Sequence, residues 1–210
     1  MRADVFRAWI TAAANVIEEQ RDHLTQLDAA IGDADHGINL SRGFTAVLGA
    51  MQTSAPATPG SVLTLTGSTL ISKVGGASGP LFGTAFRSAG KALGDTADVD
   101  MTGLAAALEA ALAGVQRLGA AREGDKTMVD ALAPATGAFT KAIAEGASDA
   151  SALAALADAA RAGAVATISM QALKGRASYL GPRSVGHEDP GAASTALILA
   201  ALRDAALASS

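Results

Sequence analysis

Apolar residues recur every three to four positions through most of this chain, and this helical period constrains its fold more than any other feature. In the N-terminal segment, Val5, Trp9 and Ile17 fall on one face of a helical wheel. The period predicts one long amphipathic helix over residues 2–28. Such a helix places Asp28 at its C-terminal end.

The same period predicts further helices over residues 39–53, 61–73, 80–93, 102–118, 127–145, 150–172 and 190–208. Only residues 62–66 resemble a strand, and we assign them to a helix because Leu70 and Ile71 continue an apolar stripe of helical period. Ala and Gly dominate several long stretches, which favours helices that pack closely through small side chains. We therefore expect an all-α bundle of about eight helices that forms a single domain over residues 1–210.

Composition excludes several classes of protein. The 210 residues carry a formal net charge of −4 and few basic clusters, whereas a protein that binds nucleic acid normally has a concentrated Lys/Arg face. The chain has no Cys, so disulfides and thiolate metal sites are excluded. No run of apolar residues reaches the ~18 of a membrane span, and no signal-peptide pattern precedes the first helix. We expect a cytoplasmic protein with neither nucleic acid nor a membrane as partner.

Three carboxylates lie within eight residues where the first helix ends, namely those of Asp28, Asp33 and Asp35. Like charges this close repel one another unless a cation joins them, and Mg²⁺ commonly sits between carboxylates and substrate phosphates. One interpretation is therefore a metal site, and the other is a solvated turn in which an Asp caps the helix that begins near Asn39. His36, next in the chain, fits a contact to phosphate or metal, and equally an ordinary surface or capping position.

Three further loops have compositions that suit a nucleotide. Residues 74–83 are glycine-rich and open a helix whose free N–H groups attract anions, although a tight turn between helices explains the glycines equally well. Residues 119–128 contain Asp125, a candidate cap for the next helix, and Met128, which suits the core or the flat face of a base. Residues 173–189 gather two arginines, a lysine, a histidine and the only Tyr, which favours an anionic ligand over a merely exposed loop.

Four motifs within these segments resemble, in order, those of the L subunit family of dihydroxyacetone kinases. They are Ile-Gly-Asp-Ala-Asp-His-Gly at residues 31–37, Gly-Ala-Ser-Gly-Pro-Leu-Phe-Gly at residues 76–83, Gly-Asp-Lys-Thr-Met at residues 124–128 and Gly-Arg-Ala-Ser-Tyr-Leu-Gly at residues 175–181. The related nucleotide-binding domain of fatty-acid kinases shares the aspartate turn but carries Gly-Asn-Ser-Gly in the glycine loop. The resemblance implies a closed barrel of eight antiparallel helices, whose loops at one end hold a nucleotide with two Mg²⁺ ions.

The resemblance also implies roles for individual residues. The two magnesium ions would be coordinated by Asp28, Asp33 and Asp35. The nucleotide contacts would come from His36, Gly37, Ile38, Asn39, Ala77 and Ser78 at the phosphates and ribose, from Gly119 and Met128 at the adenine, and from Arg176 and Asp189 in the C-terminal loop. Arg176 would also act catalytically, because a guanidinium suits the charge that builds on a phosphoryl group during transfer.

The resemblance covers only the L portion of such kinases, which implies a free subunit of a phosphotransferase-system-dependent kinase. In such systems ADP stays bound as a cofactor, a phosphohistidine protein of the M type recharges it to ATP, and the phosphoryl group passes to dihydroxyacetone held by the K subunit. Two alternatives remain open. One is a signalling module whose nucleotide state acts on a transcriptional regulator, and the other is a kinase subunit for another small ketose.

Overall fold

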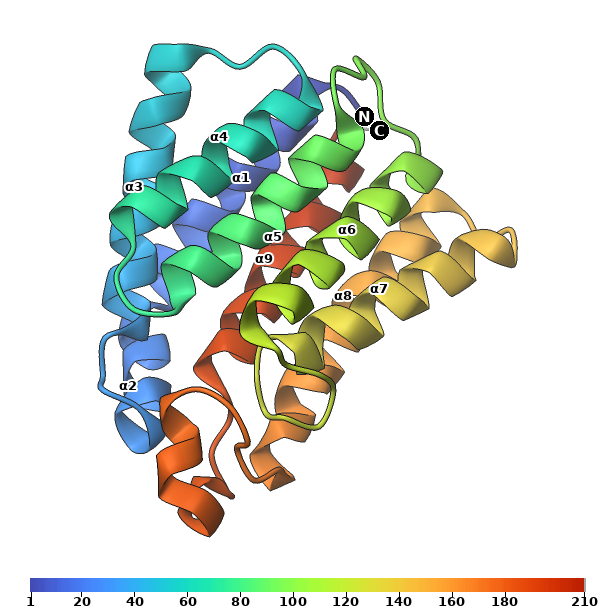
Figure 1. The fold of residues 1–210 in the computed structure, drawn as a ribbon. Coiled ribbons are helices and arrows are strands. Elements are labelled where there is room, and N and C mark those ends of the chain that lie inside the picture. Colours follow the sequence, from blue (N-terminus) through green and yellow to red (C-terminus); the bar gives the residue numbers. More distant parts are fainter. Residues whose placement is uncertain (210) are drawn as a thin grey trace.

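The structure, a computed structural model, describes residues 1–209, and within that range it consists of helices and loops without a strand (Figure 1). Its elements are α1 (Ala3–Glu19), α2 (Arg21–Ile31), α3 (His36–Ser54), α4 (Pro59–Lys73), α5 (Ser78–Leu93), α6 (Met101–Gly119), α7 (Val129–Ala144), α8 (Asp149–Ala166), the 3-10 helices η1 (Thr167–Ser169) and η2 (Arg176–Ser184), and α9 (Pro190–Leu207). The prediction of an all-α fold is confirmed, and residues 62–66 lie within α4 as expected.

The α-helices other than α2 form a closed ring. Each contacts the next along the chain, α1 contacts α3 directly, and α9 returns to contact α1. Successive helices run in opposite directions, so one end of the barrel carries both chain termini and the other carries α2 and η2 (Figure 1). The closed barrel implied by the resemblance is therefore confirmed, with α2 added at one end, where it packs on α3 and α9.

The long first helix expected over residues 2–28 is broken into α1 and α2. The break falls at Gln20, whose φ of −95° and ψ of 7° leave the helical region. The apolar period continues from Ile17 to Leu24 across the break, so the pattern carries no sign of it. The bend accommodates the start of α3, because a Cβ added to Gly37 would lie 2.0 Å from the carbonyl oxygen of Arg21. The backbones of α2 and α3 therefore approach too closely at this point for any residue other than glycine at position 37.

The C-terminal loop is also more regular than expected. The helix predicted over residues 150–172 ends at Ala166 and continues as η1, and η2 occupies part of the loop predicted over residues 173–189. Gly181, with φ of 56°, and Pro182 interrupt η2, so its turns are short and tight. These features come from local turn geometry, which the helical period does not detect.

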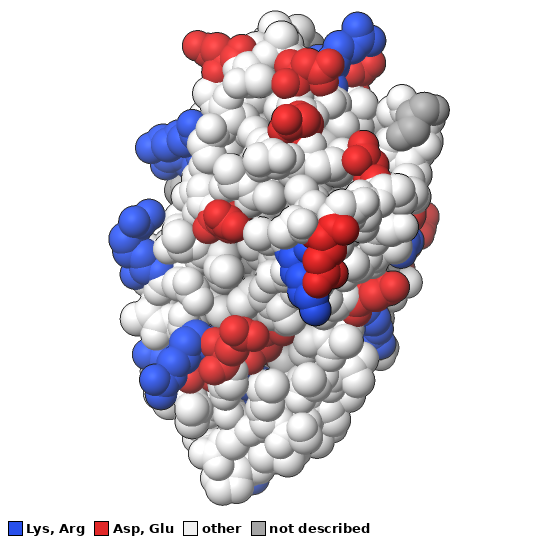
Figure 2. Space-filling model, turned by 90° about the vertical axis from the view of Figure 1, so that its right-hand side faces the viewer, with Lys and Arg blue, Asp and Glu red and all other residues white. Residues whose placement is uncertain are grey.

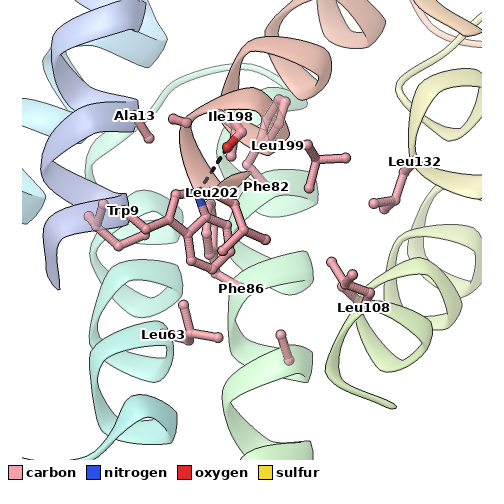
Figure 3. Packing of buried hydrophobic residues seen from close by; sticks show 14 of the residues in the cluster. Trp9, Ala13, Leu63, Phe82, Phe86, Leu108, Leu132, Ile198, Leu199 and Leu202 are labelled. Atoms are coloured by element: carbon pink, nitrogen blue, oxygen red, sulfur yellow. Dashed lines mark hydrogen bonds between the residues drawn. The ribbon is translucent and has the colours of Figure 1, made fainter. Parts of the chain in front are cut away.

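A single large apolar cluster fills the barrel, and Trp9 joins three of its helices (Figure 3). The indole N–H of Trp9 in α1 donates to the carbonyl oxygen of Ile198 in α9 at 2.9 Å, and its ring centroid lies 5.7 Å from that of Phe86 in α5. A second, smaller cluster contains Ile31, Ala172 and Ala177, with Leu180 packed against it. The segment that includes η2 therefore rests on a small core of its own.

Figure 2 shows one face of the molecule, on which Lys and Arg side chains lie near acidic ones in the upper and middle parts of the view, while the lowest part is almost entirely uncharged. The segment Asp149–Ser169 is long and apolar enough to cross a membrane by length and composition, with a mean hydropathy of 1.3. It packs between α7 and α9. One such helix is weak evidence for a membrane span, because the core helix of a globular protein passes the same test.

Candidate functional site

The loops at the α2 end of the barrel enclose a cavity of about 300 Å³. Four stretches of chain border it, namely the turn after α2, the loop between α4 and α5, the loop between α6 and α7, and the segment from η2 to the start of α9. The lining combines carboxylates and cationic groups with the apolar side chains of Leu81, Phe82, Val115 and Met128. This mixture suits a ligand that has a ring system at one end and charge at the other.

The aspartate turn places three carboxylates side by side. Asp28 projects from the last turns of α2, and the chain then reverses through Ala34, whose φ of 61° lies in the left-handed region. For a residue with a Cβ this conformation costs about 1 kcal/mol or more. The result is that ligand oxygens of Asp28, Asp33 and Asp35 all lie within 4.8 Å of one another.

These carboxylates carry more negative charge than nearby cations neutralise. Arg176 lies 3.1 Å from Asp33, and this is the one ion pair that reaches the three aspartates within residues 1–209. The buried Asp28 accepts backbone hydrogen bonds from Asp35 at 2.8 Å and from His36 at 3.2 Å. Three converging oxygen donors with residual negative charge fit a hard divalent cation such as Mg²⁺.

Gly32 is required for this arrangement. A Cβ added at Gly32 would lie 2.0 Å from the Oδ1 atom of Asp28 and 3.0 Å from its carbonyl oxygen. Any larger residue would therefore displace the Asp28 carboxylate from its position beside the other two. Steric contact with Asp28 thus explains why the Ile-Gly-Asp motif has glycine at position 32.

His36 connects two walls of the cavity. Its Nδ1 lies 3.0 Å from the hydroxyl of Ser78 and its Nε2 lies 2.9 Å from the hydroxyl of Ser194. Ser194 donates its own proton to the carbonyl oxygen of Pro190 at 2.9 Å, so we assign the ring proton to Nε2 and an acceptor role to Nδ1. Burial lowers the pKa of His36 to about 4, opposed by the charge of Asp28, so the ring is neutral near pH 7.

The glycine-rich loop leads directly into α5. Gly76, with φ of 66°, is followed by Ala77 and Ser78, and all three line the cavity. The first N–H groups of a helix have no acceptor within the helix, so this end of α5 is suited to an anion. A Cβ at Gly79 would lie 2.3 Å from the carbonyl oxygen of Val74, which shows how tightly the loop folds onto the end of α4.

The loop between α6 and α7 is held by Asp130. Its two carboxylate oxygens accept from the backbone N–H of Gly124 at 2.5 Å and of Thr127 at 2.8 Å. Asp125 accepts from the N–H of Arg122 at 3.0 Å, so it stabilises the turn and does not cap α7 as one interpretation of the sequence had it. Met128 is buried in the cavity wall. Sequence reasoning gave no role to Asp130.

The C-terminal segment contributes Arg176 and Asp189. The Arg176 side chain is largely exposed and reaches Asp33 across the cavity mouth. Asp189 caps α9, because its Oδ2 accepts from the N–H of Ala192 at 2.8 Å. Burial raises the pKa of Asp189 to about 7, although the hydrogen bond from Ala192 and the charge of Lys126 oppose the shift. Lys126 itself is buried and was not predicted as part of the site.

Most of the predicted site residues border this one cavity. Its lining includes Asp28, Asp33, Asp35, His36, Ala77, Ser78, Gly119, Met128, Arg176 and Asp189. The other three predicted residues lie outside the lining. Gly37 packs on α2, Ile38 is 51% exposed, and Asn39 accepts a hydrogen bond from Arg42 at 2.8 Å. The individual ligand roles remain predictions for all of them.

Comparison with known proteins gives one family and a consistent set of relatives. The DAK2 domain family matches residues 30–204. The PEP-dependent dihydroxyacetone kinase, ADP-binding subunit DhaL, of Escherichia coli strain K12 is 42% identical over 198 residues, which are 94% of this chain and 94% of that protein. The corresponding subunit of dihydroxyacetone kinase 1 from Listeria innocua is 41% identical over 92% of each chain. D-erythrulose kinase of Mycolicibacterium smegmatis is 38% identical over 92% of this chain but only 34% of its own length.

Solved structures agree with these relatives. The crystal structure of the dihydroxyacetone kinase of C. freundii superposes with a TM-score of 0.73 at 28% identity, over 97% of this chain and 34% of that one. The structure of the same kinase in complex with AMP-PNP and Mg²⁺ gives a TM-score of 0.71 over 93% of this chain and 33% of that one. The helical barrel therefore corresponds to about a third of that kinase.

Proposed function

The chain belongs to the DAK2 domain family, and on that premise we propose that it is the nucleotide-carrying subunit of a dihydroxyacetone kinase. It holds ADP, or ATP when charged, together with two Mg²⁺ ions in the cavity at the α2 end of the barrel. The relatives that match along almost their whole length are named ADP-binding subunits, and the C. freundii kinase binds AMP-PNP and Mg²⁺ in its crystal structure.

One observation carries this proposal above the others. Asp28, Asp33 and Asp35 present oxygens within 4.8 Å of one another at the mouth of a cavity whose other walls are a glycine-rich helix start and an apolar pocket. Mg²⁺ is commonly bound by a few carboxylates plus substrate phosphates. The cavity offers the carboxylates and leaves room for the phosphates.

Each wall has a task in the proposed complex. The three aspartates would hold the magnesium, which would neutralise negative charge on the phosphates. The start of α5, with Ala77 and Ser78, binds phosphate oxygens through its free backbone N–H groups. His36 is neutral, so it orients the Ser78 hydroxyl without adding charge. The apolar pocket around Gly119 and Met128 receives the adenine.

Arg176 acts on the group that is transferred. Its guanidinium stands at the cavity mouth and carries a permanent positive charge, which stabilises the charge that spreads over the phosphoryl oxygens. In this proposal the chain supplies positioning and charge, the attacking hydroxyl belongs to dihydroxyacetone held on a K subunit, and a phosphohistidine protein of the M type restores ATP from ADP. The PEP-dependent relatives support this relay, which we propose takes place in the cytoplasm.

The test is the nucleotide content of the purified, exhaustively dialysed protein, measured by acid extraction and chromatography with and without a chelator. We expect ADP at close to one equivalent, retained in the presence of Mg²⁺ and lost with the chelator. Replacing Asp33 and Asp35 together by Ala should reduce retained ADP to below about one tenth, because the metal loses most of its protein ligands.

Asp95→Ala is the matched control, since Asp95 is an exposed carboxylate just beyond the opposite end of α5. It should retain ADP as the wild type does. A double aspartate variant that holds ADP as tightly as the wild type would refute the metal assignment. A wild-type protein that is empty, or that exchanges ATP freely, would instead favour an ordinary ATP-dependent reaction.

A second candidate is a kinase subunit for another small ketose. The similarity to D-erythrulose kinase over 92% of this chain supports it, because the barrel alone does not contain the substrate site in the proposed relay. Pairing the purified subunit with K-type partners and comparing dihydroxyacetone with erythrulose separates the two. A nucleotide-dependent contact with a transcriptional regulator is compatible with either, and would appear as ADP-sensitive binding to the regulator without phosphoryl transfer.

A further inference from the structure

Lys126 is a buried cation beside the cavity whose hydrogen bonds all go to the backbone. It is only 1% exposed, and its Nζ donates to the carbonyl oxygens of Thr167 at 2.7 Å, Met170 at 3.2 Å and His187 at 2.5 Å. An ammonium group has three protons, so each has one acceptor. No donor is left for a ligand, although Lys126 belongs to the cavity lining.

These bonds join separate parts of the site. Lys126 lies in the loop between α6 and α7, Thr167 and Met170 lie where α8 gives way to η1 and the chain beyond it, and His187 precedes α9. Two further hydrogen bonds connect the same segments. The N–H of Leu173 donates to the carbonyl oxygen of Asp125 at 3.0 Å, and the N–H of Asp189 donates to the hydroxyl of Thr167 at 2.9 Å.

The backbone at Lys126 has an unusual conformation, with the side chain directed into the protein. Lys126 has φ of 60°, a left-handed conformation that costs about 1 kcal/mol for a residue with a Cβ. Asp130 holds the turn on both sides of it, through the N–H groups of Gly124 and Thr127. Such strain persists only where surrounding contacts determine the conformation, which here are the Asp130 bonds and the three carbonyl groups.

The charge of Lys126 is balanced locally. Burial lowers its pKa, and the carboxyl of Asp189 opposes that shift. Three carbonyl acceptors favour the charged ammonium further, since each bond is strengthened by the charge. A neutral replacement would leave the carbonyl oxygens of Thr167, Met170 and His187 without this donor.

We propose that Lys126 is a positioning residue for nucleotide binding, whose ammonium fixes the distance between the loop that carries Met128 and the segment that carries Asp189. Gly191, at the start of α9, packs against Met128. A Cβ added to Gly191 would lie 3.6 Å from the Cβ of Met128. Lys126 therefore sets the width of the cavity on the side proposed for the adenine. The inference rests on the proposed function and adds a residue that never touches the ligand.

The experiment compares Lys126→Met with the wild type by calorimetric titration with two probes in the presence of Mg²⁺. ADP probes the whole cavity, and inorganic pyrophosphate probes the aspartate turn, the glycine loop and Arg176 but not the apolar wall around Met128. We expect the Kd for ADP to rise about 10- to 100-fold, the usual loss when a group that orients a binding residue is removed. The Kd for pyrophosphate should change less than about threefold, since Lys126 bonds to neither the aspartate turn nor the glycine loop, and Arg176 is held by its ion pair with Asp33.

The matched control is Lys141→Met, which removes an exposed lysine of α7 that pairs loosely with Glu145 at 3.8 Å. It should leave both Kd values unchanged. A folded Lys126→Met protein that binds ADP as the wild type does overturns the proposal. Equal losses for ADP and pyrophosphate also overturn it, because they indicate a general effect on the fold. A wild type that binds neither probe refutes the proposed function instead.

A chemical rescue covers the case in which Lys126→Met does not fold. The chain has no Cys, so Lys126→Cys introduces a single thiol. Alkylation of the unfolded variant with 2-bromoethylamine rebuilds a side chain with an ammonium at almost the length of lysine, and iodoacetamide gives a neutral counterpart. After refolding, the aminoethylated protein should bind ADP within about threefold of the wild type. Failure of this rescue in a protein with the wild-type circular dichroism spectrum overturns the proposal.

Discussion

The carboxyl group of Asp189 combines two demands that conflict. As the cap of α9 it accepts the N–H of Ala192 at 2.8 Å, which favours the charged form at a helix N-terminus. Burial works in the opposite direction and is the larger effect, so the pKa rises to about 7. The nearby Lys126 reduces this shift but does not cancel it.

This conflict predicts a pH dependence of stability. The folded chain keeps a proton on Asp189 that the unfolded chain releases above about pH 4, so folding becomes less favourable as the pH rises from about 4 to 7 and then levels off. Asp189→Asn retains a capping oxygen without the titration. Relative to this variant, the free energy of unfolding of the wild type should fall by about 2 kcal/mol across that window. This is about half of what the full pKa shift corresponds to, because residue 189 as a whole is half-buried and solvent screens part of the effect.

Urea unfolding at several pH values measures this difference. His36 also titrates, but it is present in both proteins, so its contribution cancels in the comparison. A constant difference between wild type and variant from pH 4 to pH 8 would show that folding does not raise the pKa of Asp189.

The pair formed by α4 and α5 fixes the glycine loop through backbone contact. A Cβ added at Gly67 in α4 would lie 2.4 Å from the carbonyl oxygen of Gly83 in α5, and one at Gly83 would lie 2.6 Å from the carbonyl oxygen of Gly67. A similar contact occurs at the other end of the pair, where a Cβ added to Gly60 at the start of α4 would lie 2.1 Å from the carbonyl oxygen of Gly94, just after α5. The start of α5, which borders the cavity, is therefore set by glycines far from it in sequence.

We predict that Gly67→Ala destabilises the protein by about 1–3 kcal/mol, because the added methyl group forces two helix backbones apart. Gly137→Ala in α7 is the control, since nothing lies within 4 Å of a Cβ there, and it should stabilise by about 0.5–1 kcal/mol through helix propensity alone. Thermal unfolding of both variants measures the difference. If Gly67→Ala were also stabilising, the close packing of α4 on α5 would be wrong.

At this scale the sequence predicts helices well and their interruptions poorly. The apolar period located the barrel helices, because one face of each is buried. It missed the break at Gln20, where burial keeps the same period on both sides, and it missed η2, whose turns depend on Gly181 and Pro182. The first miss is a bend within a correct apolar pattern, and the second is a short helix within a segment predicted as a loop.

The site shows the same division. Its four loops were predicted because glycine, carboxylate and arginine clusters mark them in the sequence. Lys126 was missed although it lies within a recognised motif, because its acceptors are 41, 44 and 61 residues away. Asp130 was missed for the related reason that a carboxylate in the first turn of a helix is common. Hydrogen bonds to distant backbone atoms leave no local pattern.

Across the whole molecule, the apolar core is unevenly divided between the barrel and the segment around η2. The large core runs through all the ring helices, whereas the segment around η2 rests on Ile31, Ala172 and Ala177. Only Ala177 and Ser184 are buried within η2. This segment borders the cavity and carries Arg176, so part of the proposed binding site lies on the part of the chain with the smallest core.

Hydrogen exchange should reveal this division. Amides of residues 173–186 have few buried neighbours and are expected to exchange by local opening, well before those of α4 and α9, which need global unfolding. Addition of ADP and Mg²⁺ should slow exchange in residues 173–186 by about tenfold or more, because the ligand binds only when this segment is folded. The loop at residues 94–100 lies at the other end of the barrel and should exchange at the same rate with and without ligand. Equal protection of residues 173–186 and α9 without ligand would mean that the small cluster is part of one cooperative core, and that Arg176 is rigidly held before any nucleotide binds.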